Sequence, residues 1–242
     1  KSSVNQSYNN LEIIIINDCS ENKELIINIV KKFSDIRIKV VHFDVNKGVS
    51  SCLNHALRIC KGDYISWLSH DDLYHRDKIL TQVNIIKKKG VRILYSNFYL
   101  LQDTIVKKIK STNLNYKKDP YKNILLKDNI NGCTFLIDKK IFHEIGYFNE
   151  KLRHIQDYDM WIRIALKYKI FYTPDYLVYS RVHSNQSSKL FHNDAYYEKE
   201  NFYLFFLILN TLNLNDFLFN IKYIFSLGLR RYLSILSLYK FI

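Results

Sequence analysis

The chain has 242 residues, of which 48% are hydrophobic, so it is long enough for one sizeable core and lacks the composition of a disordered protein. Its formal net charge of +13 suits nucleic acid, an anionic membrane surface or an anionic small substrate. No zinc-finger, RRM or basic-zipper signature is present, which makes nucleic acid the weakest of these partners. The four cysteines form no CxxC pair, and we expect free thiols in a reducing compartment.

The first half of the chain alternates between strand and helix patterns. The predicted strands are 11–16, 36–43, 63–68 and 92–100, and the predicted helices are a segment that ends near Phe33, then 49–60 and 77–89. Helices of this length between strands are typical of βαβ units, and they predict an α/β fold with a mainly parallel sheet flanked by helices. Ligands bind such sheets beyond the carboxyl ends of the strands, so we expect Asp18, Asp71 and Asp72 at one edge.

The second half is less regular. A polar, irregular stretch with one short helix at 121–127 is followed by a strand-like segment at 131–138, a helix at 141–146, a helix at 157–168, and strands at 170–172 and 177–182. After about Ser188 the composition shifts to Phe, Leu, Ile and Tyr, and predicts helices at 195–212 and 217–241. We therefore expect an α/β domain at 1–190 and a C-terminal aromatic and basic helical region at 191–242.

Two adjacent carboxylates, Asp71 and Asp72, follow the third predicted strand. Adjacent carboxylates repel each other unless a cation lies beside them, and Mg²⁺ or Mn²⁺ prefers carboxylate and phosphate oxygens as ligands. The alternative is that Asp72 caps the next helix while Asp71 is solvated. Asp18, which follows four isoleucines, has the same two interpretations: an acceptor for a base or ribose, or a helix cap.

Two further candidates lie in the second half. Asp157 and Asp159 flank Tyr158 at the start of a predicted helix, where an acid is often only a partner for the helix dipole. A catalytic role for such an acid requires a nearby acceptor hydroxyl. His183 follows a strand and Arg181, and a lone histidine is more often structural than a ligand. Taken singly, these residues leave both interpretations open.

The order and spacing of these segments resemble the family 2 inverting glycosyltransferases of the GT-A fold. The resemblance covers about residues 1–190, and it is carried by the segments 3–8, 11–20, 46–56, 62–65, 67–72, 131–133, 145–149, 156–163 and 179–183. It implies a GT-A-type, Rossmann-like domain that takes a nucleotide-sugar donor.

The resemblance also implies roles on the donor side. Asp18, Lys47 and Asp71 resemble nucleotide-binding residues, and Asp18 resembles the acid that reads the base. Asp71 and Asp72, with His183, resemble the residues that hold a divalent metal, Mn²⁺ or Mg²⁺.

On the acceptor side, Asp157 resembles the general base, and Trp161 and Gly132 resemble residues that line the acceptor. Two positions depart from the family pattern: Ser69 replaces the usual first acid of the metal-binding element, and Gln156 replaces a Glu.

A third departure concerns the N-terminus. The family normally begins with an apolar strand, whereas Lys1 falls inside what should be the following helix. We therefore expect a truncated sequence that lacks a central strand.

The resemblance implies transfer of a sugar from a nucleoside-diphosphate donor, most simply a UDP-sugar, with inversion. The acceptor would be a glycan or a lipid-linked sugar in cell-surface polysaccharide synthesis. No secretory signal and no run of about 18 apolar residues is present, and we expect a cytoplasmic protein at the inner face of the membrane. The C-terminal basic and aromatic helices suit peripheral contact with anionic lipid, although ordinary packing is the alternative. Rival functions are a non-catalytic nucleotide-sugar-binding or scaffold protein and a nucleotidyltransferase.

Overall fold

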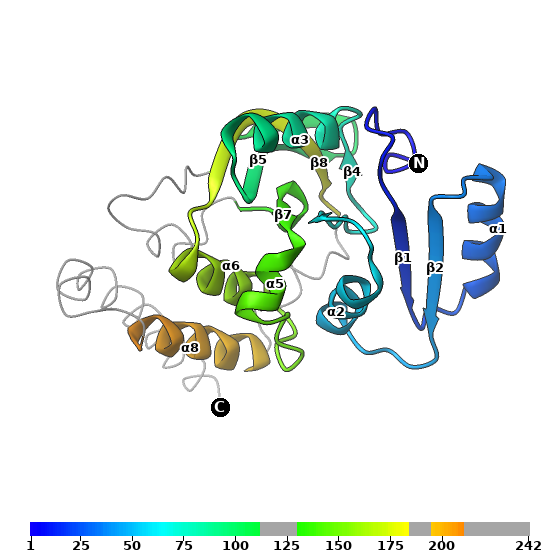
Figure 1. Cartoon of the computed structure of the whole chain (residues 1–242). Coiled ribbons are helices and arrows are strands. Elements are labelled where there is room, and N and C mark those ends of the chain that lie inside the picture. The colour runs from blue at the N-terminus through cyan, green and yellow to red at the C-terminus, as the bar shows by residue number, and fades with distance from the viewer. Residues whose placement is uncertain (112–129, 184–194, 211–242) are drawn as a thin grey trace.

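The structure is a computed structural model that describes residues 1–111, 130–183 and 195–210 (Figure 1). The strands are β1 (Ile13–Asp18), β2 (Ile38–Phe43), β3 (Tyr64–Ile65), β4 (Leu73–Tyr74), β5 (Ile93–Gln102), β6 (Ile105–Ile109), β7 (Leu136–Asp138) and β8 (Phe171–Arg181). The helices are α1 (Lys23–Phe33), α2 (Val49–Ile59), α3 (Lys78–Lys89), α5 (Lys139–Ile145), α6 (Gln156–Lys167) and α8 (Ala195–Leu209), with a 3-10 turn at Gly132–Thr134. In this part of the chain, no helix is both long and apolar enough to cross a bilayer.

The strands form two separate sheets. β1 and β2 pair in parallel, with Ile13 opposite Ile38, and α1 lies beside them (Figure 1). The other six strands form a mixed sheet in the order β3-β7-β5-β8-β4, with β6 paired to β5. The predicted α/β class is confirmed.

The expectation of a mainly parallel sheet is wrong. Among the strand pairs of the described residues, only β1 with β2 and β5 with β8 run parallel, and the other four pairs are antiparallel. The reason is that β6 returns from β5 as a hairpin, while β4 and β7 enter the sheet against the direction of their neighbours.

Local differences from the predicted elements have physical causes. β6 was not predicted because nearly all of its residues are exposed, so it shows no alternation of buried and exposed positions. β8 was predicted as two strands, but it is one strand whose register with β5 shifts near Ser96 and Asn97. The shift accommodates Pro174, which has no N–H for the ladder and whose carbonyl accepts a hydrogen bond from Asn97 Nδ2 at 2.8 Å.

Two layers of helix cover the six-stranded sheet. On one face, Leu94 and Leu136 pack with Val83 and Ile86 of α3. On the other face lies the main core, which joins β5 and β7 to α5, α6 and α8 through Tyr95, Phe135, Ile137, Ile141, Phe142, Met160, Trp161, Ile164 and Leu204. The side chains of adjacent β5 residues therefore point to opposite faces of the sheet, as is usual in a strand.

The C-terminal region is described only in part. The predicted helix at 195–212 is present as α8, which contributes Leu204 to the main core. The predicted helices at 121–127 and 217–241 lie outside the described residues. A boundary between 190 and 191 stays a prediction.

Candidate functional site

The loop between β3 and β4 carries Asp71 and Asp72. β3 is shorter than predicted. Two hydrogen bonds fix the chain that follows it: Ser66 Oγ donates to the carbonyl of Phe135 at 2.7 Å, and Tyr74 Oη donates to the carbonyl of Trp67 at 2.5 Å. The Nζ of Lys78, which is fully buried, donates to Ser66 Oγ at 2.7 Å. The loop is therefore fixed by a polar network beneath it.

Asp71 faces two imidazoles. His70 Nε2 lies 2.8 Å from Asp71 Oδ1, and His183 Nε2 lies 3.2 Å from Asp71 Oδ2. His183 Nε2 is buried and has no hydrogen-bond partner, because its approach to Asp71 does not have hydrogen-bond geometry. An imidazole nitrogen and a carboxylate oxygen that face each other in this way match the donor set of a divalent cation. Asp71 and His183, 112 positions apart in the chain, thus lie beside each other.

Asp72 is oriented differently. Its Oδ1 accepts from the backbone N–H of Arg181 at 3.0 Å, and its side chain is buried. Burial raises the pKa of the Asp72 carboxyl, and the hydrogen bond from Arg181 opposes the rise. The predicted trio Asp71, Asp72 and His183 does not form one group: within the described ranges, no three His, Cys, Asp or Glu side chains are arranged to hold a metal. Asp72 also does not cap α3, whose N-cap is Asp77.

Asp18 and Lys47 meet at the end of the two-stranded sheet. Asp18 is the last residue of β1, and Asn17 Oδ1 accepts from the backbone N–H of Ser20 at 3.1 Å just beyond the strand. The Asp18 carboxylate accepts from the backbone N–H of Lys47 at 2.7 Å and of Gly48 at 2.8 Å. It therefore shapes the turn before α2 and does not cap α1, whose N-cap is Asn22.

The expectation that Asp18 and Asp71 share one edge of a single sheet is wrong in one respect: they belong to different sheets. Those sheets are joined near the starts of β1 and β3, where Glu12 accepts from the backbone N–H of Lys61 at 2.5 Å and of Gly62 at 2.7 Å.

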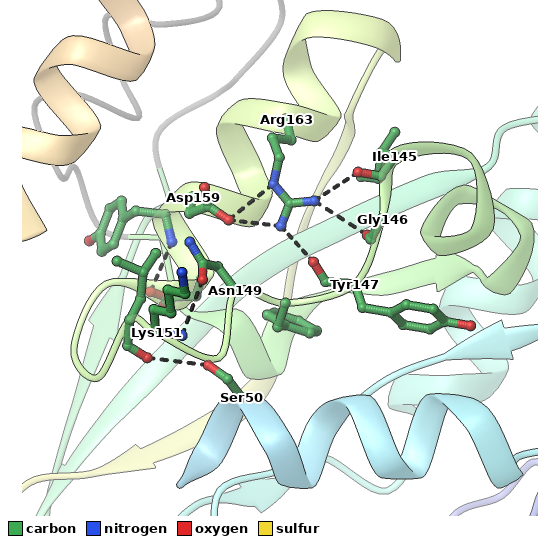
Figure 2. Close-up of polar contacts among 12 residues, drawn as sticks. Ser50, Ile145, Gly146, Tyr147, Asn149, Lys151, Asp159 and Arg163 are labelled. Carbon is green, nitrogen blue, oxygen red and sulfur yellow. Dashed lines mark hydrogen bonds and ion pairs between the residues drawn. The ribbon is translucent and has the colours of Figure 1, made fainter.

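The two acids at the start of α6 have different surroundings. Asp159 is buried, and its Oδ2 accepts from Arg163 Nε at 3.0 Å and from the terminal guanidinium nitrogen at 2.7 Å (Figure 2). Asp157 is half-buried in the first turn, where its Oδ1 accepts from the backbone N–H of Tyr158 at 2.9 Å. Asp159 is therefore an ion-pair residue of the fold, which leaves Asp157 as the candidate base.

Trp161 and Gly132 were expected to line the acceptor side. Trp161 is fully buried and stacks on Trp67, with ring centroids 5.4 Å apart and planes at 9°. Trp67 thus lies over Trp161, and only Trp67 is partly exposed. A Cβ added to Gly132 would lie 2.8 Å from Trp67 Cζ2, so Gly132 is the position that admits this ring. An acceptor contact at this place would be made by Trp67, to which the sequence analysis assigned no acceptor role.

Two other residues near the site were also missed. Glu200 and Tyr203 of α8 contact the start of α6: Glu200 Oε1 accepts from the backbone N–H of Arg153 at 2.6 Å, and Tyr203 Oη donates to Asp159 Oδ1 at 3.0 Å. No sequence signal marks them, because their partners lie more than 40 positions away in the chain.

The comparisons with known proteins agree with this architecture. Residues 1–146 match the family model described as glycosyl transferase family 2. An uncharacterized glycosyltransferase of Rickettsia felis is 38% identical over 204 residues, which are 79% of this chain and 33% of that protein. The UDP-Glc:alpha-D-GlcNAc-diphosphoundecaprenol beta-1,3-glucosyltransferase WfaP of Escherichia coli is 31% identical, over 69% of this chain and 63% of that protein. The chain thus spans a third of the first relative and under two thirds of the second.

Solved structures share the fold. The crystal structure of S. aureus TarS in complex with UDP-GlcNAc superposes with a TM-score of 0.68 at 19% identity, over 87% of this chain and 60% of that one. The mannosyltransferase PcManGT from Pyrobaculum calidifontis, in complex with GDP-Man and Mn²⁺, superposes with a TM-score of 0.57 at 15% identity, over 78% of this chain and 53% of that one. The predicted GT-A-type fold is confirmed, and the chain belongs to glycosyl transferase family 2.

Proposed function

We propose that this chain transfers a sugar from a nucleoside-diphosphate donor to an acceptor hydroxyl, with inversion at the anomeric carbon. The observation that carries the proposal is the pairing of Asp71 with His183, 3.2 Å apart. Asp71 lies on the loop whose Trp67 stacks on Trp161 of α6, the helix that also bears Asp157. The arrangement connects a cation-binding pair to a candidate base through one aromatic contact.

The donor is proposed to be a UDP-sugar. The turn built by Asp18 with Lys47 and Gly48 leaves a carboxylate and an ammonium group at the carboxyl end of β1, where α/β sheets bind nucleotides. The support from relatives is that TarS binds UDP-GlcNAc and WfaP uses UDP-Glc.

A divalent metal, Mn²⁺ or Mg²⁺, fits the residues present. Asp71 and His183 would hold it, because His183 Nε2 is buried without a hydrogen bond and faces a carboxylate oxygen. When bound, such an ion neutralises negative charge on the departing diphosphate. Asp72 would support the loop from behind rather than provide a principal ligand, since its Oδ1 is bonded to Arg181.

Asp157 is proposed as the general base of a single displacement. Its carboxylate takes the proton from the acceptor hydroxyl while that oxygen forms a bond to the anomeric carbon. The bond from the anomeric carbon to the diphosphate oxygen breaks on the opposite side, which gives inversion. Trp161 lies one helical turn after Asp157 and so on the same face of α6, which directs Asp157 toward the side where Trp67 stacks.

The acceptor is proposed to be a glycan or a lipid-linked sugar in cell-surface polysaccharide synthesis. WfaP, by its name, acts on a sugar linked to undecaprenol through a diphosphate. Net charge of +13 suits an anionic lipid surface, so we place the protein in the cytoplasm at the inner face of the membrane, with peripheral contact. Flotation of the full-length protein with anionic liposomes tests this; a protein that stays in the soluble fraction contradicts it.

The activity is tested by release of UDP from UDP-Glc and UDP-GlcNAc by the full-length protein, with Mn²⁺ or with a chelator. We expect turnover that requires the metal and that Asp157→Asn reduces by roughly 10²–10⁴-fold. Asp103→Asn, at an exposed hairpin tip where φ is 51°, is the matched control because Asn tolerates that backbone conformation.

Two further measurements on the full-length protein distinguish the rival functions. A non-catalytic nucleotide-sugar-binding protein binds UDP without turnover. A nucleotidyltransferase transfers the nucleotidyl group of a nucleoside triphosphate to a sugar phosphate and releases pyrophosphate.

A further inference from the structure

The start of α6 has no side-chain cap of its own. Its N-cap residue is Ile155, which has no polar side-chain atom. Three consecutive backbone N–H groups before the helix are instead bound by Glu200 of α8: Oε1 accepts from Arg153 at 2.6 Å, and Oε2 accepts from His154 at 2.9 Å and Ile155 at 3.2 Å. The Glu200 side chain is buried, so these groups have little access to water.

Other residues on the same face of α8 fix this contact. Tyr203 Oη donates to Asp159 Oδ1 at 3.0 Å, Leu204 is buried in the main core, and the Arg153 guanidinium lies 4.7 Å from the ring centroid of Tyr196. Positions three and four apart in a helix share a face, so Tyr196 and Glu200 meet the segment before α6 while Tyr203 and Leu204 meet α6 and the core. α8 is thereby bound to the segment that leads into α6, the helix that carries Asp157.

A carboxylate suits this position better than any neutral side chain. Backbone N–H groups at a helix N-terminus carry partial positive charge, and hydrogen bonds to an ionised acceptor are stronger than neutral ones. Glutamine has one acceptor oxygen, so in either orientation its NH₂ group would face at least one N–H donor that Glu200 now satisfies. The neutral isostere therefore disrupts at least one of the three hydrogen bonds.

We infer that Glu200 is a positioning residue of the transfer reaction: it fixes the first turn of α6 and, through it, the Asp157 carboxylate two residues after Ile155. The inference rests on the proposed function, in which Asp157 is the base. It assigns to α8 a part in positioning the base, since α8 provides the acceptor for the N–H groups that lead into α6.

This role predicts a separation of kinetic effects. Asp18 is the last residue of β1 in the other sheet, Lys47 lies in the turn before α2, and Asp71 lies on the loop after β3. Displacement of Asp157 should therefore lower kcat while donor binding persists. Small misplacement of a catalytic group lowers rate steeply, so we expect a roughly ten- to hundredfold loss of kcat for Glu200→Gln.

The test uses the full-length protein and four Glu200-related variants: Glu200→Gln, Glu200→Ala, Glu200→Asp and Tyr203→Phe. For each, kcat, the donor KM, the Kd of UDP and the unfolding midpoint are measured. Glu24→Gln, the same chemical change on the exposed face of α1, and Lys199→Gln, beside Glu200 on α8, are the controls.

We expect Glu200→Gln to lose kcat with donor KM and UDP Kd within about twofold of wild type, and Glu200→Asp to retain more kcat because it keeps both acceptor oxygens. If Glu200→Ala does not fold, Glu200→Gln and Glu200→Asp still decide. A kcat unchanged in folded Glu200→Gln overturns the inference, and so does an equal loss of kcat and UDP binding, which indicates general unfolding. If kcat is unchanged in Glu200→Gln while Asp157→Asn abolishes turnover, the proposed function stands and the inference fails. Near-normal turnover of Asp157→Asn contradicts the base assignment itself.

Discussion

Trp67 and Trp161 stack with their ring planes at 9°, although they are 94 positions apart in the chain. Trp67 belongs to the loop that carries Asp71, and Trp161 belongs to α6, which carries Asp157 in its first turn. Trp161 also stacks on Phe135 of the main core, with ring centroids 3.8 Å apart. The loop with the proposed metal-binding residue and the helix with the proposed base are therefore joined by one stack of aromatic rings that ends in the main core.

Replacement of Trp161 should destabilise the protein strongly. Trp161→Ala removes a fully buried ring and leaves a cavity beneath Trp67, at a cost of about 3–5 kcal/mol in the free energy of unfolding. Urea denaturation followed by far-UV circular dichroism measures this. Leu166→Ala, at an exposed position of the same helix, is the control and should change the free energy by less than about 1 kcal/mol.

A methyl group at Gly132 should displace Trp67. The added Cβ would lie 2.8 Å from Trp67 Cζ2, which is closer than atoms can approach, so Gly132→Ala should cost about 1–3 kcal/mol and weaken the near-UV circular dichroism of the stacked pair. At Gly62 a Cβ would meet its nearest atoms at 3.6 Å, so Gly62→Ala is the matched control. Identical near-UV spectra for both variants would contradict the steric account.

Arg163 should be essential for the segment that precedes α6. It donates to Asp159 and to the carbonyls of Ile145 at 2.9 Å, Gly146 at 3.3 Å and Tyr147 at 2.9 Å (Figure 2). Arg163→Met leaves the Asp159 carboxylate buried without its guanidinium, which should cost about 3–5 kcal/mol. Thermal and urea unfolding measure the loss. A change below about 1 kcal/mol would show that the ion pair does not hold these elements.

Lys78 should make stability depend on pH. Burial lowers the pKa of Lys78 to about 7 from an ordinary value of 10.5. Between these values the unfolded chain binds the proton and the folded chain does not, so stability should rise as pH increases from about 7 toward 10.5, by at most roughly 1.4 kcal/mol per pH unit. Below pH 7 both states are charged, and the penalty for burying the ammonium group is fully present.

The measurement for Lys78 is the free energy of unfolding from pH 6.5 to 9.5, compared with Lys78→Met. Subtraction of the two curves removes other titrating groups, including Tyr74 and Cys133, which face Lys78. We expect the difference between the proteins to grow in favour of wild type as pH rises. A difference that stays constant across this range would contradict a titration of Lys78 near neutrality.

The sequence predicted the parts of the fold that depend on local pattern. The isoleucine run of β1 and the helical spacing of α2 and α3 gave elements close to those observed. Strand direction was not predictable in this way, because the antiparallel pairing of β7 with β5 joins segments about 40 positions apart. The β5–β6 hairpin was missed because strand β6 is solvated on both sides.

The site was predicted unevenly for a similar reason. The pairing of Asp71 with His183 came from the family resemblance, not from spacing. The different orientation of Asp72, by contrast, depends on the backbone N–H of Arg181, 109 positions later. The burial of Trp161 beneath Trp67 depends on tertiary packing that residue types do not encode. Contacts from α8 were missed since Glu200 acts on backbone N–H groups, which have no sequence signature.

The claim that Asp71 and His183 hold a metal for a UDP-sugar is tested most directly by calorimetric titration of UDP into the full-length protein, with Mn²⁺ and with a chelator. Wild type, Asp71→Asn, His183→Ala and the control Asp103→Asn are compared. We expect UDP to bind wild type and the control at least tenfold more tightly with Mn²⁺ than with chelator, and we expect both site variants to lose this dependence. UDP affinity that is the same with and without Mn²⁺, and unchanged in Asp71→Asn and His183→Ala, would contradict the account.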